Sequence, residues 1–404
     1  MKLICKSLII LFFLFKLNAS AQTAFIPEGK WRGVFHQTNG TAVPFNFEVT
    51  GQSAETAKVY LLNAQERFET GTLIQRGDSL FIPFNQFETE LAFKIGDKKL
   101  SGVFRKQGGG RAIPVDATYG QTYRFEEGEK PAADLSGTYD VVFKTSTGKE
   151  EKTVGLFKQT GNKLYATFMR ISGDSRFLEG TVNGNQFSLS SFIGGGVAYY
   201  TGSFNAAGVI NGTNSNAEFT GTKNAAAALP DPYALTYLKP GYTSFDLSLP
   251  DVNGKTISLK DEKYKNKVVI VTITGTWCPN CMDEANFLSP WFKKNKERGV
   301  EAIGVHFERK ADPAYVKTAI ESFKKRHGIE YDEVFGGLAD KNAVAAAFPA
   351  LNTFLSFPTI LFIDRKGNVA KIYTGFTGPA TGIYYDRFIK EFNAEIDTLL
   401  KAQI

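Results

Sequence analysis

A change of hydrophobic pattern part-way along the chain most constrains its fold. From Trp31 to Thr222, apolar and polar residues alternate over short stretches, of which Phe45 to Val49 is one, and glycine-containing turns separate them. No helical period interrupts this region. Beyond it, apolar strand-like stretches alternate with amphipathic helical ones. We therefore expect an all-β region followed by an α/β region with a mixed sheet.

Two stretches of the all-β region resemble each other. Their landmarks recur at a nearly constant spacing, which favours an internal duplication. The pairs are Trp31 with Tyr139, Phe35 with Phe143, Lys58 with Lys163, Gly71 with Gly180 and Gly102 with Gly212. We expect two antiparallel β-meander units, at 25–126 and 133–223. Their opening and closing glycine-aromatic motifs resemble those of lipocalin-like modules that precede catalytic domains in secreted bacterial proteins.

The first residues have the pattern of an export signal. Lys2 and Lys6 precede an apolar run from Leu8 to Phe15, and the small residues Ala19 to Ala21 follow it. The run is short for a membrane span, which needs about 20 residues. We predict a cleaved signal peptide at 1–21 and a periplasmic protein. The alternative is that the segment stays uncleaved as a membrane anchor.

The composition excludes several classes of protein. The chain has 404 residues, of which 43% are hydrophobic, so it can form packed cores. Its three cysteines are too few for a disulfide-rich scaffold. The net charge of +6 is spread along the chain, and nothing indicates nucleic-acid binding. Signal cleavage would remove Cys5 and leave only Cys278 and Cys281.

The second half of the chain is predicted to be one α/β domain. Residues 224–240 contain two prolines within three positions and are predicted to be a linker. In the domain at 241–404, the pattern predicts strands at 268–273, 300–305, 359–363 and 371–374, and helices at 279–296 and 313–325. Spacings of four, four and three predict a C-terminal amphipathic helix carrying Phe388, Phe392, Ile396 and Leu399.

The strongest chemical signal is the motif from Cys278 to Cys281, which reads Cys-Pro-Asn-Cys. It follows a predicted buried strand and opens a predicted helix. The unpaired N–H groups at a helix N-terminus stabilise a thiolate, so the first cysteine there is expected to be reactive. Pro279 suits the first helical turn because it has no N–H group. One turn later, Cys281 is placed to attack a mixed disulfide on Cys278.

Other uses of the two cysteines fit less well. A structural zinc site needs about four ligands, and His36, His306 and His327 are scattered along the chain. A c-type haem attachment needs a histidine after the second cysteine, where this chain has Met282. An inert structural disulfide remains an open alternative. We expect no cofactor and no metal.

From Tyr242 to its C-terminus, the chain resembles the TlpA/ResA group of extracytoplasmic thioredoxin-fold proteins. The resemblance covers about 160 of the 404 residues. It rests on the segment Phe245 to Asp251 with Gly254, Ser258 and Leu259, on Trp277 to Cys281, on Glu284, and on Phe357 to Asp364 with Gly367. It implies a thioredoxin fold and thiol-disulfide oxidoreductase activity.

The resemblance also implies roles for individual residues. Cys278 would be the exposed nucleophile and Cys281 the buried resolving thiol of a redox-active disulfide. Glu284 would manage protons near Cys281, although it is also an ordinary acidic residue for the start of a helix. The remaining roles are substrate contacts, at Trp277 beside the disulfide, at Pro279 within the motif, and at Phe357 and Pro358, the latter as a cis-proline facing the site. A packed core position is the alternative for Trp277.

Two positions depart from the pattern of the group. Asn286 stands where many members have proline, and Phe357 is bulkier than the usual residue before the cis-proline, which leaves substrate specificity open. Peroxiredoxins share the fold, but they have threonine three residues before the peroxidatic cysteine. That position is Gly275 here, which disfavours a peroxidase.

These observations predict an exported thiol-disulfide oxidoreductase, functioning in redox homeostasis and reducing the disulfides of exported proteins. The resemblance implies a membrane thiol transporter as its electron donor, because the compartment is oxidising. The alternative is that the β-repeats form the main functional part and bind a ligand or partner, with an accessory redox domain.

Overall fold

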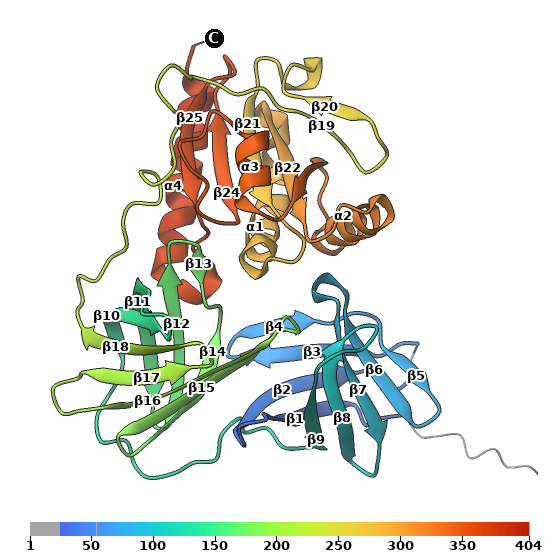
Figure 1. Ribbon diagram of the computed structural model, residues 1–404, viewed down its shortest axis with the longest axis vertical. Coiled ribbons are helices and arrows are strands. Elements are labelled where there is room, and N and C mark those ends of the chain that lie inside the picture. The colour runs from blue at the N-terminus through green and yellow to red at the C-terminus, as the bar shows by residue number, and fades with distance from the viewer. Residues whose placement is uncertain (1–24, 54, 404) are drawn as a thin grey trace, which may run out of the picture.

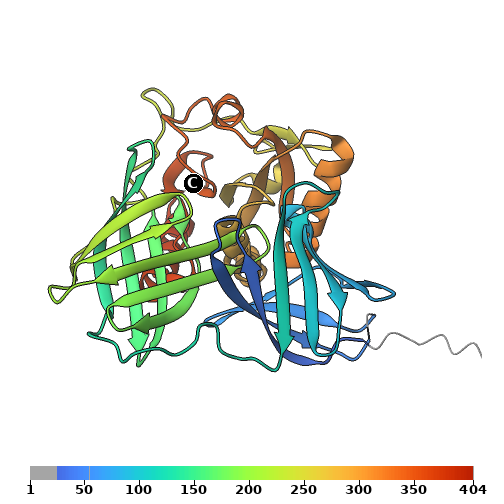
Figure 2. The same ribbon diagram turned by 60° about the horizontal axis from the view of Figure 1, so that its bottom comes forward.

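The computed structural model describes residues 25–53 and 55–403, which form three units (Figure 1). Two β units lie side by side, and an α/β unit lies across them (Figures 1 and 2). In this described part, no helix is both long and apolar enough to cross a membrane. The predicted signal peptide at 1–21 lies outside the described residues.

The first unit is an antiparallel meander. Its strands, where described, form a nine-stranded sheet in the order β4-β3-β2-β1-β9-β8-β7-β6-β5, so the first strand pairs with both the second and the last. The elements are β1 Gly29–His36, β2 Ala42–Thr50, β3 Lys58–Asn63, β4 Glu66–Glu69, β5 Ile74–Arg76, β6 Ser79–Phe84, the 3-10 turn η1 Asn85–Phe87, β7 Thr89–Ile95, β8 Lys99–Lys106 and β9 Ala112–Tyr119.

The second unit is a closed barrel within residues 137–223, all of which are described. Its strands are β10 Gly137–Thr145, β11 Glu150–Thr160, β12 Lys163–Arg170, β13 Gly173–Asp174, β14 Leu178–Asn183, β15 Gln186–Phe192, β16 Val197–Phe204, β17 Ile210–Asn214 and β18 Ala217–Lys223. Pairing of β11 with β12 closes eight strands, and the short β13 extends from the end of β12. The two expected antiparallel meanders are therefore present, while their duplication and lipocalin-like character remain predictions.

Aromatic side chains fill the interior of the closed barrel. Phe168 lies in edge or tilted contact with Phe143, Phe157 and Phe219, and its ring stacks on Tyr200 at 5.1 Å. All five residues are buried. Rings that meet at these distances contribute beyond their area of burial, so this interior is a packed core.

Phe192 joins the two β units. It ends β15 of the second unit, but its ring packs among Phe35, Phe45, Phe84 and Phe104 of the first, with centroids 4.8 to 5.4 Å apart. Only 1% of Phe192 is exposed. The second unit thus completes the core of the first.

Two neighbouring features tighten the same junction. The buried Arg124, between the units, donates to the backbone oxygens of Leu62 and Ser190 and to the Ser190 hydroxyl. Gly194 has φ +97°, and a Cβ there would lie 2.3 Å from the Phe84 ring. Only glycine suits such a position. The backbone of the β15–β16 turn therefore packs closely against the first unit.

The third unit has a five-stranded sheet in the order β23-β22-β21-β24-β25 within the described residues. Its elements are β19 Ser248–Pro250, β20 Thr256–Ser258, η2 Glu262–Tyr264, β21 Val268–Thr274, α1 Pro279–Asn295, η3 Lys296–Arg298, β22 Val300–Glu308, α2 Pro313–His327, β23 Asp332–Leu338, α3 Lys341–Ala347, β24 Thr359–Ile363, β25 Val369–Thr374, η4 Pro379–Thr381 and α4 Ile383–Lys401. β21, β22 and β23 run parallel, whereas β24 pairs antiparallel with both β21 and β25, which confirms the predicted mixed sheet.

The buried strand β21 divides its side chains between the two faces of this sheet. Val268 and Ile270 pack with α1 and α4, while Val269 and Val271 pack on the other face, with α3 and the segment of β19 and β20. Because both faces are covered, all seven residues of β21 are buried, which is why its β-branched run is continuous. The sequence pattern did not predict β23, α3 or the β19–β20 pair.

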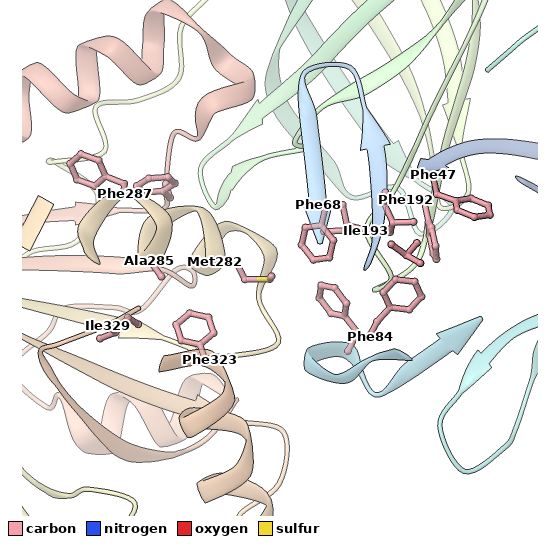
Figure 3. Packing of buried hydrophobic residues seen from close by; sticks show 14 of the residues in the cluster. Phe47, Phe68, Phe84, Phe192, Ile193, Met282, Ala285, Phe287, Phe323 and Ile329 are labelled. Carbon is pink, nitrogen blue, oxygen red and sulfur yellow. The ribbon is translucent and has the colours of Figure 1, made fainter. Parts of the chain in front are cut away.

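The hydrophobic face around α1 continues into the first β unit. One cluster of buried residues contains Phe68 and Phe84 of the first unit together with Met282 and Ala285 of α1 (Figure 3). The Arg326 guanidinium of α2 lies 4.6 Å from the Phe68 ring centroid. The core of the first unit is therefore continuous with the α1 side of the third unit, and Phe192 and Ile193 of the second unit belong to the same cluster.

The segment predicted as a linker, residues 224–240, begins on β10 of the second unit, where Asn224 donates its backbone N–H to Thr138, and then follows the surface of the third unit. Thr374 donates its backbone N–H to Pro232, and Lys239 donates its backbone N–H to Ala350, at 3.1 and 2.8 Å. Leu238 forms an isolated β-bridge with Leu351. This segment is thus fixed in place along its length.

We predict that Phe192→Ala destabilises the first β unit by about 3–5 kcal/mol, because it leaves a cavity among four aromatic rings. Amide hydrogen exchange of β1 and β2 measures this loss in the full-length protein. Tyr242→Ala, at a residue 51% exposed, is the control and is expected to change stability by less than about 0.5 kcal/mol. An unchanged exchange rate in β1 and β2 of Phe192→Ala contradicts the role of this ring as a shared core.

Candidate active site

The motif Cys278 to Cys281 lies where β21 ends and α1 begins, as predicted. Cys278 is the N-cap residue of α1, and its sulfur accepts a hydrogen bond from the backbone N–H of Cys281 at 3.3 Å. Pro279 occupies the first helical position. Both cysteines are free thiols; Cys278 is 6% exposed and Cys281 is fully buried. The Cys278 sulfur thus has the N–H contact that favours a thiolate.

The predicted cis-proline lies against the first cysteine. The peptide bond between Phe357 and Pro358 is cis, which confirms the prediction from the motif. The Cys278 thiol contacts the backbone oxygen of Phe357 at 3.7 Å. Since Pro358 has no N–H group, the adjoining backbone is held beside the sulfur without pairing there.

Trp277 closes the side of the site next to Phe357. Its indole N–H donates to the backbone oxygen of Phe307 at 2.9 Å, and its ring meets the Phe357 ring edge-on at 5.4 Å. The Arg309 guanidinium lies 5.4 Å from the Trp277 ring centroid. Trp277 is half-buried, so part of its ring remains available as a contact surface.

Glu284 and Cys281 lie one turn apart in α1, both buried. Burial raises the pKa of Glu284 well above its ordinary value, and negative charge on Cys278 raises it further. Burial likewise raises the pKa of Cys281 well above its ordinary value, and its interactions with Cys278 and Glu284 raise it further. Among the described residues, the Glu284 Oε1 atom has no hydrogen-bond partner. A buried carboxyl without a partner is poised to exchange a proton.

Behind the motif is a buried charged cluster that the sequence analysis missed. The Nε2 atom of His306 lies 3.1 Å from Glu333, and its Nδ1 atom lies 3.5 Å from Glu308. Glu308 in turn accepts hydrogen bonds from the backbone N–H and the hydroxyl of Thr276, at 2.9 and 2.8 Å. The cluster therefore holds the residue that leads into Trp277 and Cys278.

The charge of His306 also reaches Glu284. Burial by itself would lower the pKa of His306, but the Glu333 and Glu308 carboxylates raise it to about 9. His306 is thus a buried cation at neutral pH, and its charge partly opposes the rise in the pKa of Glu284. His306 and Glu308 lie on β22, whereas Glu333 comes from β23, and the three form no recognised motif, so sequence spacing gave no signal for them.

The structure brings together all seven residues that the sequence predicted for the site: Trp277, Cys278, Pro279, Cys281, Glu284, Phe357 and Pro358. A second missed group, around Arg176 of the barrel, contacts the same motif. In the part of the chain that the structure describes, no cluster of three or more His, Cys, Asp or Glu side chains has an arrangement suited to a metal ion.

We predict that the unfolding free energy falls by on the order of 3 kcal/mol as the pH rises from about 6.5 to about 9, through His306. The folded protein keeps the His306 proton up to about pH 9, whereas the unfolded chain releases it near 6.5, so rising pH favours unfolding. In His306→Gln this fall disappears. Denaturation at a series of pH values measures it.

His36→Gln is the control for this titration, because His36 is exposed on β1 and its loss is expected to leave the pH dependence intact. A His306→Gln protein that loses stability over this pH range as the native protein does would show that His306 is neutral when folded.

Comparison with known protein families places the site in context. The model of the AhpC/TSA family matches residues 240–372. The thiol-disulfide oxidoreductase ResA of Bacillus subtilis is 32% identical over 127 residues, which are 31% of this chain and 63% of that protein. ResA of Geobacillus kaustophilus is 29% identical over 140 residues, 35% of this chain and 72% of that protein. The chain thus spans under two thirds of the length of the first of these relatives.

A search of solved structures also found matches to part of the chain. A thioredoxin family thiol:disulfide interchange protein from Chlorobium tepidum has a TM-score of 0.30 at 22% identity, covering 39% of this chain and 96% of its own. A thiol-disulfide oxidoreductase from Bacteroides fragilis has a TM-score of 0.29 at 19% identity, covering 37% of this chain and 98% of its own. The part of the chain from residue 240 to 372 thus matches the AhpC/TSA family model and is similar in sequence to ResA thiol-disulfide oxidoreductases.

Proposed function

We propose that this protein is an exported thiol-disulfide oxidoreductase that reduces protein disulfides through Cys278 and Cys281. The observation that carries this proposal is the position of the Cys278 sulfur, at the N-cap of α1 and next to the cis-proline loop. Such a placement favours the thiolate and leaves a backbone edge beside it for a substrate chain. The similarity of the third unit to ResA proteins supports the same reaction.

The reaction has two exchange steps. The Cys278 thiolate attacks one sulfur of the substrate disulfide; that bond breaks, a Cys278–substrate disulfide forms, and one substrate thiolate leaves. Cys281 then loses its proton and attacks the Cys278 sulfur. The second substrate sulfur leaves as a thiolate, the Cys278–Cys281 disulfide forms, and the substrate has gained two electrons.

Glu284 is the proposed acceptor of the Cys281 proton. Before the first step, negative charge on Cys278 helps to keep the pKa of Glu284 high. That charge disappears once the Cys278 sulfur is in the mixed disulfide, so the Glu284 carboxyl ionises more readily at the moment when Cys281 must be deprotonated. Cys281 is therefore deprotonated only after the mixed disulfide has formed, which sets the order of the two steps.

The oxidised pair needs a source of electrons. In an oxidising compartment, the Cys278–Cys281 disulfide must be reduced by a dedicated dithiol partner. We propose a membrane thiol transporter for this role and a periplasmic location for the protein. The alternative of a ligand-binding β-repeat protein has less support, because aromatic side chains fill the interior of the barrel.

We predict that Cys278→Ser reduces no disulfide, whereas Cys281→Ser stops at the mixed disulfide. An unstructured synthetic peptide with one disulfide is the substrate, and reduced full-length protein is mixed with it. Mass spectrometry of acid-quenched samples then detects free peptide thiols with the native protein, no adduct with Cys278→Ser, and a stable adduct with Cys281→Ser. Peptide reduction by Cys278→Ser at the native rate would refute the mechanism.

We further predict that Glu284→Gln slows release of the mixed disulfide by about 100-fold, because the proton acceptor is lost. Stopped-flow measurement separates this step from the first attack, which Glu284→Gln should affect far less. Glu297→Gln, at an exposed residue of η3, is the matched control and should match the native protein in both steps. Equal slowing of both steps would assign Glu284 a structural role instead.

A further inference from the structure

One loop of the barrel crosses over the redox motif. Residues 171–176, here called the rim loop, follow β12 and include β13. The backbone oxygen of Ser172 accepts a hydrogen bond from the Asn280 side chain at 3.4 Å. The Asp174 carboxylate accepts one from the backbone N–H of Gly378 at 2.7 Å. The rim loop therefore bridges the Cys278–Cys281 turn and the segment after β25.

That second segment is itself part of the site. Gly375 donates its backbone N–H to the oxygen of Pro358 at 2.9 Å, which ties it to the cis-proline loop. A Cβ on Gly375 would lie 2.2 Å from the backbone oxygen of Ile171. The rim loop is thus in contact with both edges of the motif, the cysteine turn and the cis-proline side.

The approach to Asn280 is close enough to require glycine. Gly173 has φ +133°, and a Cβ there would lie 2.1 Å from the Asn280 amide nitrogen. Asn280 is the residue between Pro279 and Cys281, so the backbone of the rim loop lies against a side chain of the cysteine turn. A position with this φ and this contact accepts no side chain without displacement.

Arg176 fastens the rim loop. Its guanidinium donates to the backbone oxygen of Pro279 at 2.8 Å and pairs with Asp283 at 2.5 Å. It also pairs with Glu66 of the first β unit, and the side chains of all three charged residues are at most 10% exposed. Arg176 therefore connects all three units at the first turn of α1.

The backbone of Arg176 is held in an uncommon conformation for this purpose. Its φ is +56°, in the left-handed region that non-glycine residues seldom adopt. The N–H of Arg176 donates to Asp174 at 2.6 Å, which fixes the turn. Strain of this kind persists where the surrounding contacts determine the conformation, and it concentrates at functional sites.

The ion pairs around Arg176 exist only while the three units are docked together. The Arg176 guanidinium faces the carboxyls of Glu66, Asp174 and Asp283. Burial raises the pKa of Asp283 to about 7 in spite of Arg176, and burial also raises that of Asp174. Removal of the cation would leave buried carboxyls without compensation, so the docking of the rim loop depends on Arg176.

The first β unit is also fixed to the third unit through α2 and the residues just before it. Lys310, just before α2, pairs with Glu88, and Arg326 of α2 donates to the backbone oxygen of Glu69. The rim loop and these contacts hold β units on two sides of the third unit. Cys278 is left only 6% exposed.

We propose that the rim loop and Arg176 determine which disulfides reach Cys278, admitting small disulfides and disulfides in extended chains and excluding those on folded protein surfaces. This inference rests on the proposed function and specifies its substrate class. An extended substrate chain needs only the space along the backbone of Phe357 next to Cys278. The surface of a folded substrate would contact the barrel before the substrate sulfur reached Cys278. Arg176 acts here as a specificity residue and takes no part in the exchange.

The test compares two substrates with the same disulfide. One is the unstructured peptide, and the other presents that peptide sequence as a short disulfide-closed loop on a folded carrier protein. Full-length native protein is expected to reduce the free peptide faster by about 100-fold. Arg176→Gln and, independently, Gly173→Val should lower this ratio by about tenfold or more, because each displaces the rim loop. Arg105→Gln, which breaks an ion pair within the first β unit, should leave it unchanged.

A second measurement on the native protein needs no variant. Alkylation of reduced Cys278 is timed with a small maleimide and with a maleimide on a long polyethylene glycol chain, and each rate is divided by its rate in denaturant. We expect the normalised alkylation rate of Cys278 to be much lower with the large maleimide than with the small one.

The outcomes separate the two claims. Equal reduction of peptide and folded carrier by the native protein, or equal normalised alkylation, overturns the rim-loop proposal and leaves the oxidoreductase standing. Failure to reduce either substrate while the small maleimide still reacts overturns the proposed function instead.

Discussion

The hydrogen bond from the Cys281 backbone N–H to the Cys278 sulfur is the interaction on which the site depends. It makes a cysteine the N-cap of α1, and it therefore requires that the helix begin within one residue of its observed start. Pro279 fixes that start, and Thr276, held by Glu308, fixes the chain that leads into it. The cis-proline loop then completes the position of the sulfur. Each of these contacts serves to hold one sulfur at a helix N-terminus beside the cis-proline loop.

Two buried charged clusters support this arrangement from opposite sides. Behind the motif, His306 is a cation between two glutamates; in front of it, Arg176 faces three carboxyls. In both, acidic groups outnumber the cation, and in the Arg176 cluster burial raises the pKa of Asp283 and of Asp174. The first cluster lies within the α/β unit and stabilises the strand ends. The second joins the three units, which makes the β region part of the active-site surface rather than a separate spacer.

Features that depend on local interactions could be predicted from the sequence, whereas features that depend on contacts between distant segments could not. The strand at 268–274 and the helix from Pro279 were predictable, because continuous β-branched residues and a helix-start motif are local signals. β23 was not, because its charged and glycine-rich sequence has no strand period and it is held by pairing with β22. The site residues next to the cysteines and the cis-proline followed from the motif. His306 and Arg176 reach the site only through folding across distant segments, and no spacing in the sequence marks them.

The central claim is that Cys278 and Cys281 form a reversible redox couple that donates electrons. The reduction potential of the full-length protein, measured by equilibration in glutathione buffers and quantification of both thiols, tests it most directly. The account predicts a two-electron couple with a potential nearer to the about −270 mV of thioredoxin than to the about −120 mV of a strong oxidant. A potential near the second value would reverse the direction of electron flow. A pair that never exchanges with glutathione would contradict the redox function altogether.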